Sequence, residues 1–97
     1  MPLKIRYSLR ALDEELALLT YLRNEFGPST ARKVYQDIEF MLAKIVAMPD
    51  MFPVSIREPG LRKCVLSRRT SIYYRVVDEY LEVISIRDNR MDATGKL

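Results

Sequence analysis

The sequence predicts an α+β fold in the order β-α-α-β-β-β, with a helical hairpin packed on one face of an antiparallel sheet. Two segments of helical periodicity fill the first half of the chain and are separated by Gly27-Pro28. Three strand-like runs joined by short polar connections follow Gly60. Because 97 residues is close to the usual size of one domain, residues 1–97 are expected to form a single domain.

The first strand and the first helix are predicted from residues 3–26. Leu3 to Tyr7 alternate between apolar and polar, as in a half-buried strand, and Ser8 provides a hydroxyl cap for the following helix. Apolar residues then recur at intervals of three and four, which predicts a stripe packed on the core. The acidic run Asp13–Glu15 is expected on the solvated side. The apolar stripe consists of Leu9, Leu12, Leu16, Leu19, Leu22 or Arg23, and Phe26.

The second helix is predicted between two prolines. Gly27 and Pro28 end the first helix, because glycine accepts a left-handed cap and proline cannot continue the hydrogen-bond ladder. The second helix starts directly afterwards and Pro49 ends it, so the two helices form an antiparallel hairpin. Residues 50–59 contain further prolines and are expected to be an irregular connection. The apolar stripe of the second helix consists of Ala31, Val34, Ile38, Met41 or Leu42, Ile45 and Met48.

The three strands after Gly60 are predicted at residues 61–66, 71–77 and 80–87. Their connections are too short for anything other than an antiparallel meander. The last strand is almost continuously apolar, as is typical of a central strand. In the middle strand, period two directs Ile72, Tyr74 and Val76 to the helices and leaves Tyr73 and Arg75 on the open face. In the strand at residues 61–66, apolar residues occur at both odd and even positions. The pattern therefore does not decide whether Arg62 or Lys63 lies on the open face.

The charge distribution indicates a basic surface in the second half of the chain. The net charge is +3, yet the first 59 residues carry eight basic and eight acidic side chains. The run from Gly60 to Val77 has five basic residues and no acidic one, which favours binding to a polyanion. These five are Arg62, Lys63, Arg68, Arg69 and Arg75.

Residue usage excludes several kinds of site. A single cysteine, Cys64, rules out an internal disulfide and indicates a reducing compartment, and its apolar neighbours predict an inert core thiol. The chain has no histidine, so the usual general base at neutral pH and the commonest metal ligand are missing. No metal site and no cofactor are therefore expected. No apolar run approaches membrane-spanning length and no signal peptide is evident, which predicts a cytoplasmic protein without membrane partners.

The ordered set of segments resembles a known family. A strand, a helical hairpin and a proline-rich connection precede GLRK at residues 60–63, IYYRV at 72–76, a short acidic turn and ISIRDNRMD at 84–92. This order resembles the RelE/ParE family of bacterial toxins over essentially the whole chain. The resemblance implies the toxin of a type II toxin–antitoxin pair, neutralised by a partner that wraps it. One branch of the family cleaves mRNA in the ribosomal A site, and another inhibits DNA gyrase.

Only part of the cleaving branch's residue set is matched. Arg62 and Arg90 occupy basic positions of that branch, whereas Cys64, Ser71 and Asp88 stand where relatives carry a basic residue, an arginine and a histidine. The late tyrosine of the branch has no counterpart in residues 92–97. The segment at 74–76, Tyr-Arg-Val, looks closer to the ParE-like side, which has no catalytic residues to transfer.

Three functional readings remain open. The first is a metal-independent, ribosome-dependent endoribonuclease, with Arg62, Arg75 and Arg90 as catalytic cations and Asp88, Glu82 or Lys63 as the base. The second is a ParE-like block of DNA gyrase, and the third is a non-catalytic basic module that binds an antitoxin or nucleic acid without toxicity. Nucleic-acid contacts are predicted for Lys63, Arg68, Arg69, Tyr73 and Arg87.

The same resemblance implies the partners. A cognate antitoxin is expected to be a small acidic protein encoded by an adjacent gene, and the target is either the ribosome with its mRNA or DNA gyrase. Whether the chain forms a homodimer or a hetero-oligomer with the antitoxin is left open by the sequence.

Overall fold

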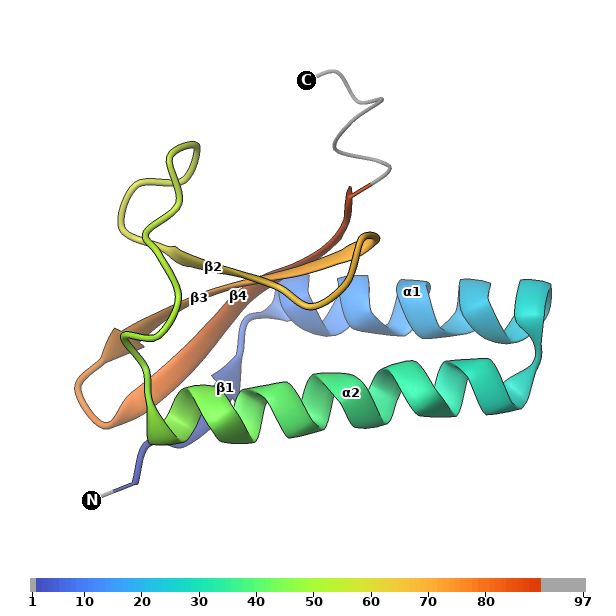
Figure 1. Cartoon of the computed structure of the whole chain (residues 1–97), viewed down its shortest axis with the longest axis horizontal. Coiled ribbons are helices and arrows are strands. Elements are labelled where there is room, and N and C mark those ends of the chain that lie inside the picture. Colours follow the sequence, from blue (N-terminus) through green and yellow to red (C-terminus); the bar gives the residue numbers. More distant parts are fainter. Residues whose placement is uncertain (1, 90–97) are drawn as a thin grey trace.

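The computed structural model describes residues 2–89, and it contains two helices and four strands in the predicted order (Figure 1). The helical hairpin extends well beyond the sheet, so that the half of the hairpin around its turn has no strand beneath it (Figure 1). No helix in this range is long and apolar enough to cross a membrane. The elements are β1 (Lys4–Tyr7), α1 (Leu9–Phe26), α2 (Pro28–Ala47), β2 (Arg62–Val65), β3 (Thr70–Val77) and β4 (Tyr80–Asp88).

The four strands form one sheet in the order β1-β4-β3-β2. β2, β3 and β4 make the predicted antiparallel meander, and β4 is central as its apolar sequence indicated. β1 pairs with β4 in parallel, so the sheet as a whole is mixed rather than antiparallel. The helical hairpin is the crossover that allows this arrangement, because parallel strands need a long connection between them.

Ser8 connects the start of α1 to the sheet. Its hydroxyl oxygen accepts a hydrogen bond from the Ala11 amide at 2.9 Å, which is the predicted helix cap, and the hydroxyl donates to the Ile84 carbonyl at 2.7 Å. At the other end of α1, Gly27 has φ of 98°, a conformation that glycine adopts without a steric cost, and Pro28 begins α2.

The hydrophobic core lies between the helices and one face of the sheet. Ile72 and Tyr74 point into it, as the period-two pattern predicted. The central residues of the α2 stripe are also buried, while Met48 at its end is 61% exposed. The buried core consists of Ala11, Ile38, Leu42, Ile45, Cys64, Ile72, Tyr74, Leu81, Val83 and Ile86.

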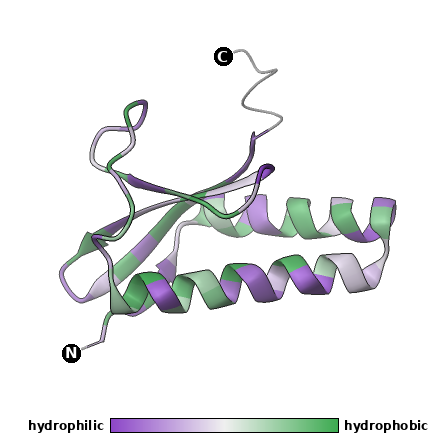
Figure 2. Cartoon of the chain, viewed as in Figure 1, coloured by the Kyte–Doolittle hydropathy of each residue, from purple (hydrophilic) through white to green (hydrophobic). Residues whose placement is uncertain are grey.

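The predicted core face of α1 is wrong. Leu9, Leu12 and Leu16 are 81%, 49% and 67% exposed, and Ala11 and Glu15 are buried in their place. Leu22 is the one residue of the predicted stripe that is fully buried among the described residues. Figure 2 shows how apolar and polar residues alternate along both helices, so hydropathy alone does not identify the buried side of α1. The rotation of α1 follows from its contacts with β4, because the Ser8 cap and the small Ala11 side chain bring that side of the helix against the strand.

The acidic run of α1 is not on the solvated side as a whole. Glu14 is half-buried and accepts hydrogen bonds from the Ser85 hydroxyl at 2.7 Å and the Ile86 amide at 3.0 Å. Glu15 is 9% exposed and lies beside Tyr7, and neither its Oε2 atom nor the tyrosine hydroxyl has a hydrogen bond of normal geometry within residues 2–89. Burial raises the pKa of both groups. Of the three acidic residues, only Asp13 lies on the solvated side as predicted.

Candidate functional site: the open face of the sheet

The strand register decides which basic side chain of β2 lies on the open face, the side of the sheet away from the helices. Lys63 is paired with Tyr73, and Tyr73 with Ser85. Residues directly opposite in an antiparallel pair point to the same side, so these three share the open face. Arg62 is paired with Tyr74, whose ring is in the core, and therefore points toward the helix side.

Arg62 is bound to the connection that follows α2. Its Nη1 atom donates to the Phe52 carbonyl at 2.6 Å, and its Nη2 atom lies 3.3 Å from the Asp50 carboxylate. The Tyr74 hydroxyl donates to the Pro49 carbonyl at 2.9 Å in the same region. Arg62 thus positions the loop between α2 and β2 and does not join Arg75 on one surface.

Tyr73 lies on the open face but is only 2% exposed, because two cations cover its ring. The Arg87 guanidinium is 4.4 Å from the ring centroid, and the Lys63 ammonium is 5.7 Å away. Both distances fit cation–π contacts. The predicted nucleic-acid contacts Lys63, Tyr73 and Arg87 are therefore brought together, with the aromatic face of the tyrosine occupied by the two side chains.

Arg87 also holds the loop of residues 48–61, which projects from the body of the molecule in Figure 1. Its Nη2 atom donates to Glu58 at 3.2 Å and its Nε atom donates to the Ser85 hydroxyl oxygen at 3.1 Å. The Arg87 side chain is only 15% exposed, so little of its guanidinium group is accessible to a ligand. Glu58 had not been singled out in the sequence, since an acidic residue in a proline-rich connection carries no periodicity.

A second charged group lies across three strands at the other end of the open face. Glu82 of β4 is paired with Arg6 of β1 on one side and with Arg75 of β3 on the other. Arg6 donates to Glu82 Oε2, from Nε at 3.0 Å and also from Nη2. Arg75 donates from Nε to the other carboxylate oxygen, Oε1, at 2.8 Å. These hydrogen bonds hold the pKa of Glu82 below its usual value.

The remaining predicted residues are spread over the molecule. Arg68 and Arg69 lie in the turn between β2 and β3, with the Arg69 guanidinium 6.0 Å from the Phe26 ring centroid. Arg90 lies outside the described residues. Ser71 is buried and donates to Asn89.

Cys64 and Asp88 lie at two positions for which the sequence resemblance implied other residue types. Cys64 is fully buried in the core, and burial raises its pKa to about 11, which keeps it as a thiol at neutral pH and agrees with the inert role predicted for it. Asp88 is the last residue of β4 and lines a small pocket on the helix side of the sheet.

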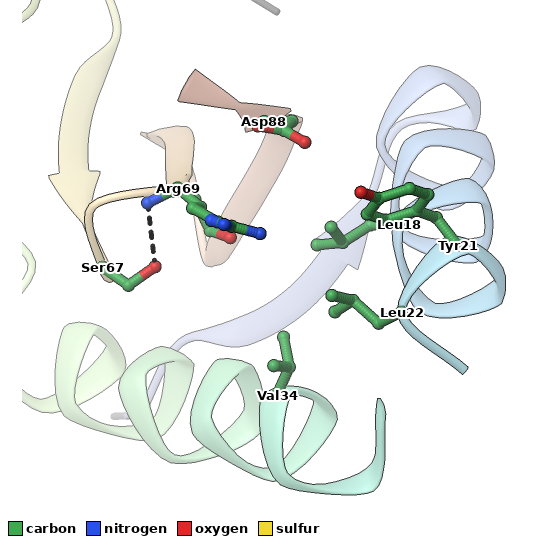
Figure 3. A pocket seen from close by; sticks show the side chains of 8 residues that line it. Leu18, Tyr21, Leu22, Val34, Ser67, Arg69 and Asp88 are labelled. Atoms are coloured by element: carbon green, nitrogen blue, oxygen red, sulfur yellow. Dashed lines mark hydrogen bonds between the residues drawn. The ribbon is translucent and has the colours of Figure 1, made fainter. Parts of the chain in front are cut away.

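This pocket lies between the hairpin and the β2–β3 turn, and its floor is apolar (Figure 3). Its volume of about 80 Å³ is far below the several hundred Å³ typical of small-molecule sites. It is also separated from the open-face residues by the sheet. The pocket is lined by Leu18, Tyr21, Leu22, Val34, Ser67, Arg69, Thr70 and Asp88.

Among residues 2–89, interacting basic side chains therefore form two separate clusters on the open face. One is the Lys63–Tyr73–Arg87 cluster tied to Glu58, and the other is the Arg6–Glu82–Arg75 bridge. Arg6 was missed in the sequence because it belongs to the first strand, whose pairing with β4 brings it across from Glu82. The signal that could have identified Arg6 is its polar position in a strand of alternating polarity.

The fold is similar to several solved toxins. The ParDE chromosomal toxin–antitoxin system from P. aeruginosa superimposes with a TM-score of 0.77, 20% identity, 89% of this chain and 95% of that chain covered. The YoeB/ParE toxin from Agrobacterium tumefaciens gives 0.66 at 16% identity, with 89% and 98% covered. The E. coli DinJ–YafQ toxin–antitoxin complex gives 0.61 at 11% identity, with 93% and 96% covered. At these identities the similarity concerns the fold.

No protein of curated function matches the chain significantly in sequence. A family model does match, over residues 5–93, and it describes the ParE toxin of the type II toxin–antitoxin system parDE. The match covers nearly all of the strands, both helices and the open face described above. The chain accordingly belongs to the ParE toxin family of type II toxin–antitoxin systems within the RelE/ParE superfamily, as the order of its segments indicated.

Proposed function

We propose that this toxin arrests growth by a ParE-like block of DNA gyrase, acting as a binding protein and not as a ribonuclease. The observation that carries the proposal is that Arg62 and Arg75, two of the three cations predicted to catalyse cleavage, lie on opposite faces of the sheet. Arg87 is held by Glu58 and Ser85, Arg75 by Glu82, and Arg62 lies on the other side of the sheet. The ParE family membership supports the same mechanism.

The chemistry of RNA cleavage supports this choice. Cleavage through the 2′-hydroxyl needs a base for that hydroxyl, cations for the pentavalent phosphate and a proton donor for the leaving oxygen. Two of the proposed bases, Glu82 and Lys63, are engaged with arginines and with Tyr73, and the pKa of Glu82 is lowered, which weakens it as a base. The Tyr73 hydroxyl belongs to a side chain that is 2% exposed.

The test separates the two mechanisms in cells. Induced expression of the chain in a bacterium without the cognate partner should arrest growth, induce the DNA-damage response and leave ribosome-bound transcripts intact. Purified chain should inhibit DNA supercoiling by gyrase. Arrest with transcripts cut at ribosome-bound codons would instead establish the ribonuclease reading, and absence of arrest would favour a non-toxic binding module.

The cognate partner of this toxin is proposed to be a small acidic antitoxin encoded by the adjacent gene, and both are placed in the cytoplasm. The solved DinJ–YafQ toxin–antitoxin complex supports such a partner, because it pairs a toxin of this fold with an antitoxin. The exposed leucines of α1 add support, since Leu9, Leu12 and Leu16 form an apolar stripe on the surface of the chain. Co-expression of the neighbouring reading frame should abolish the arrest and yield a stable complex on purification.

A further inference from the structure

We infer that Arg6 and Arg75, held in place by Glu82, form a docking site for an acidic side chain of a protein partner. The inference rests on the proposed function to the extent that the chain acts by binding proteins. It concerns the end of the open face where β1, β4 and β3 lie side by side, away from the Lys63–Tyr73–Arg87 cluster.

The bridge contains more positive than negative groups. Two guanidinium groups share one carboxylate, so the bridge carries a net positive charge. The Glu82 side chain is 15% exposed, whereas the side chains of Arg6 and Arg75 are 47% and 51% exposed. An ion pair on a protein surface contributes little to stability, and a second arginine on the same carboxylate adds little further. The arginines therefore neutralise the Glu82 carboxylate and expose the remaining positive charge to solvent.

Both arginines of the bridge keep N–H groups that can bind a ligand. Arginine has five donors. Within residues 2–89, Arg75 uses its Nε–H alone and so retains the four N–H groups of its two terminal nitrogens. Those groups form the flat edge that pairs with a carboxylate through two parallel hydrogen bonds. Arg6 uses Nε and Nη2 for Glu82 and retains Nη1.

Both guanidinium groups are oriented before a ligand binds. Glu82 holds each by its Nε atom, and the Arg6 guanidinium also lies over the Tyr80 ring, 3.9 Å from its centroid. An exposed arginine usually loses side-chain entropy when a ligand immobilises it, and this loss weakens binding. Here most of that ordering is present before binding, which favours a specific contact.

The surroundings favour a protein carboxylate over a nucleic-acid backbone. The turn that follows β3 carries the exposed acids Asp78 and Glu79, a few residues from both Arg75 and Glu82. A nucleic-acid strand has a regular series of phosphates and would meet these two acids as well as the arginines. A single Asp or Glu side chain of a protein segment contacts the arginines and avoids the turn.

The test uses the full chain with ¹⁵N-labelled arginines, and a tetraglutamate peptide as the probe. The Nε–H resonances of Arg6 and Arg75 should shift together in a saturable manner, while that of Arg10, which pairs with Glu14 on α1, should not. Arg75→Ala should weaken peptide binding about tenfold, and Arg75→Lys should recover only part of it because lysine lacks the bidentate fork. Arg32→Ala, which removes an exposed arginine of α2, is the matched control and should have no effect.

Two results would overturn the inference. One is an equal loss of peptide binding in Arg32→Ala and Arg75→Ala, which would mean that only net charge matters. The other is binding of an oligothymidylate of equal charge at the same two arginines with higher affinity than the peptide, which would make the site a phosphate site. Neither result bears on supercoiling by gyrase, so failure of this inference is distinguishable from failure of the proposed function.

Discussion

The Glu14 side chain of α1 reaches the backbone of β4 at Ile86, and the same carboxylate oxygen accepts the Ser85 hydroxyl. β1 ends at Tyr7, which is paired with Val83, so β4 continues beyond its neighbour. The Ile86 amide therefore has no strand partner on that side. A helix side chain takes the place that a strand residue would have, and this explains why an acidic residue faces the sheet.

Glu14→Ala should destabilise the protein by about 1–3 kcal/mol, because it leaves the Ser85 hydroxyl and the Ile86 amide without an acceptor in a largely buried place. Glu14→Gln keeps an acceptor oxygen and should cost less. The free energy of unfolding in urea measures both. Arg10→Ala, which removes the exposed partner of Glu14, serves as control and should change stability by less than about 0.5 kcal/mol. Equal effects for all three substitutions would contradict the assignment.

The buried Glu15 should make stability depend on pH. Burial is the main reason that its pKa is raised, with Glu39 adding to the rise and Tyr7 partly opposing it. A carboxyl with a raised folded pKa stabilises the fold most when protonated, and this contribution is lost as pH rises through the folded pKa. Glu15→Gln should therefore raise the melting temperature at pH 7.

The gain from Glu15→Gln should shrink as the pH falls through the raised pKa of Glu15 in the folded protein, because the wild-type carboxyl then becomes protonated as well. Thermal unfolding of both proteins at several pH values gives the difference at each pH and cancels the contributions of the other acids. Glu39→Gln removes an exposed carboxyl near the same site and should change the profile less. A Glu15→Gln protein that is less stable than wild type at pH 7 would refute the prediction.

Tyr73 should act through its ring and not through its hydroxyl. Tyr73→Phe keeps the contacts with Arg87 and Lys63 and should retain both stability and growth arrest. Tyr73→Ala removes a buried ring and should destabilise by about 3–5 kcal/mol, as aromatic-to-alanine changes in cores do. Urea unfolding and a growth assay measure the two effects. Loss of toxicity in a stably folded Tyr73→Phe protein would point instead to proton donation by the hydroxyl.

The Glu58–Arg87 ion pair should protect the loop of residues 48–61 from proteolysis. Arg57 is exposed and directly precedes Glu58, so trypsin cleavage there reports the opening of the loop. Arg87→Gln should accelerate cleavage after Arg57 several-fold, since the loop loses its charged contact with β4 while the residues beside the cleaved bond stay the same. Asp50→Asn weakens the ion pair of this loop with Arg62 and indicates whether the effect is specific. An unchanged rate in Arg87→Gln would show that other contacts hold the loop.

The strands and the order of elements were predictable from the sequence because local signals determine them. Gly27-Pro28 and Pro49 mark helix ends, and Asp78-Glu79 forms the turn between β3 and β4. The short connections of the last three strands then leave only one arrangement. In the middle strand, alternation also gave the correct side for Ile72 and Tyr74, whose large side chains are both buried in the core.

The face of α1 and the partners of the arginines were not predictable, because both depend on long-range pairing. The leucines of α1 have regular helical spacing, yet its rotation is set by Ser8 and Glu14 contacting residues more than 70 positions away. Likewise, Lys63 and not Arg62 lies on the open face only because β2 is in register with β3 at Tyr73. Mixed polarity within β2 conceals that register.

The pairing of β1 with β4 has a consequence for how this toxin is made. Lys4 is paired with Tyr80, so the first strand has no neighbour until the last one has been synthesised. The contacts between α1 and α2 are local in sequence, whereas closure of the sheet and docking of α1 on β4 must wait until β4 has been synthesised. The Arg6–Glu82–Arg75 bridge and the α1–β4 contacts form at this final step. A nascent chain on the ribosome therefore lacks the finished open face, and a delay separates synthesis of this toxin from its ability to bind.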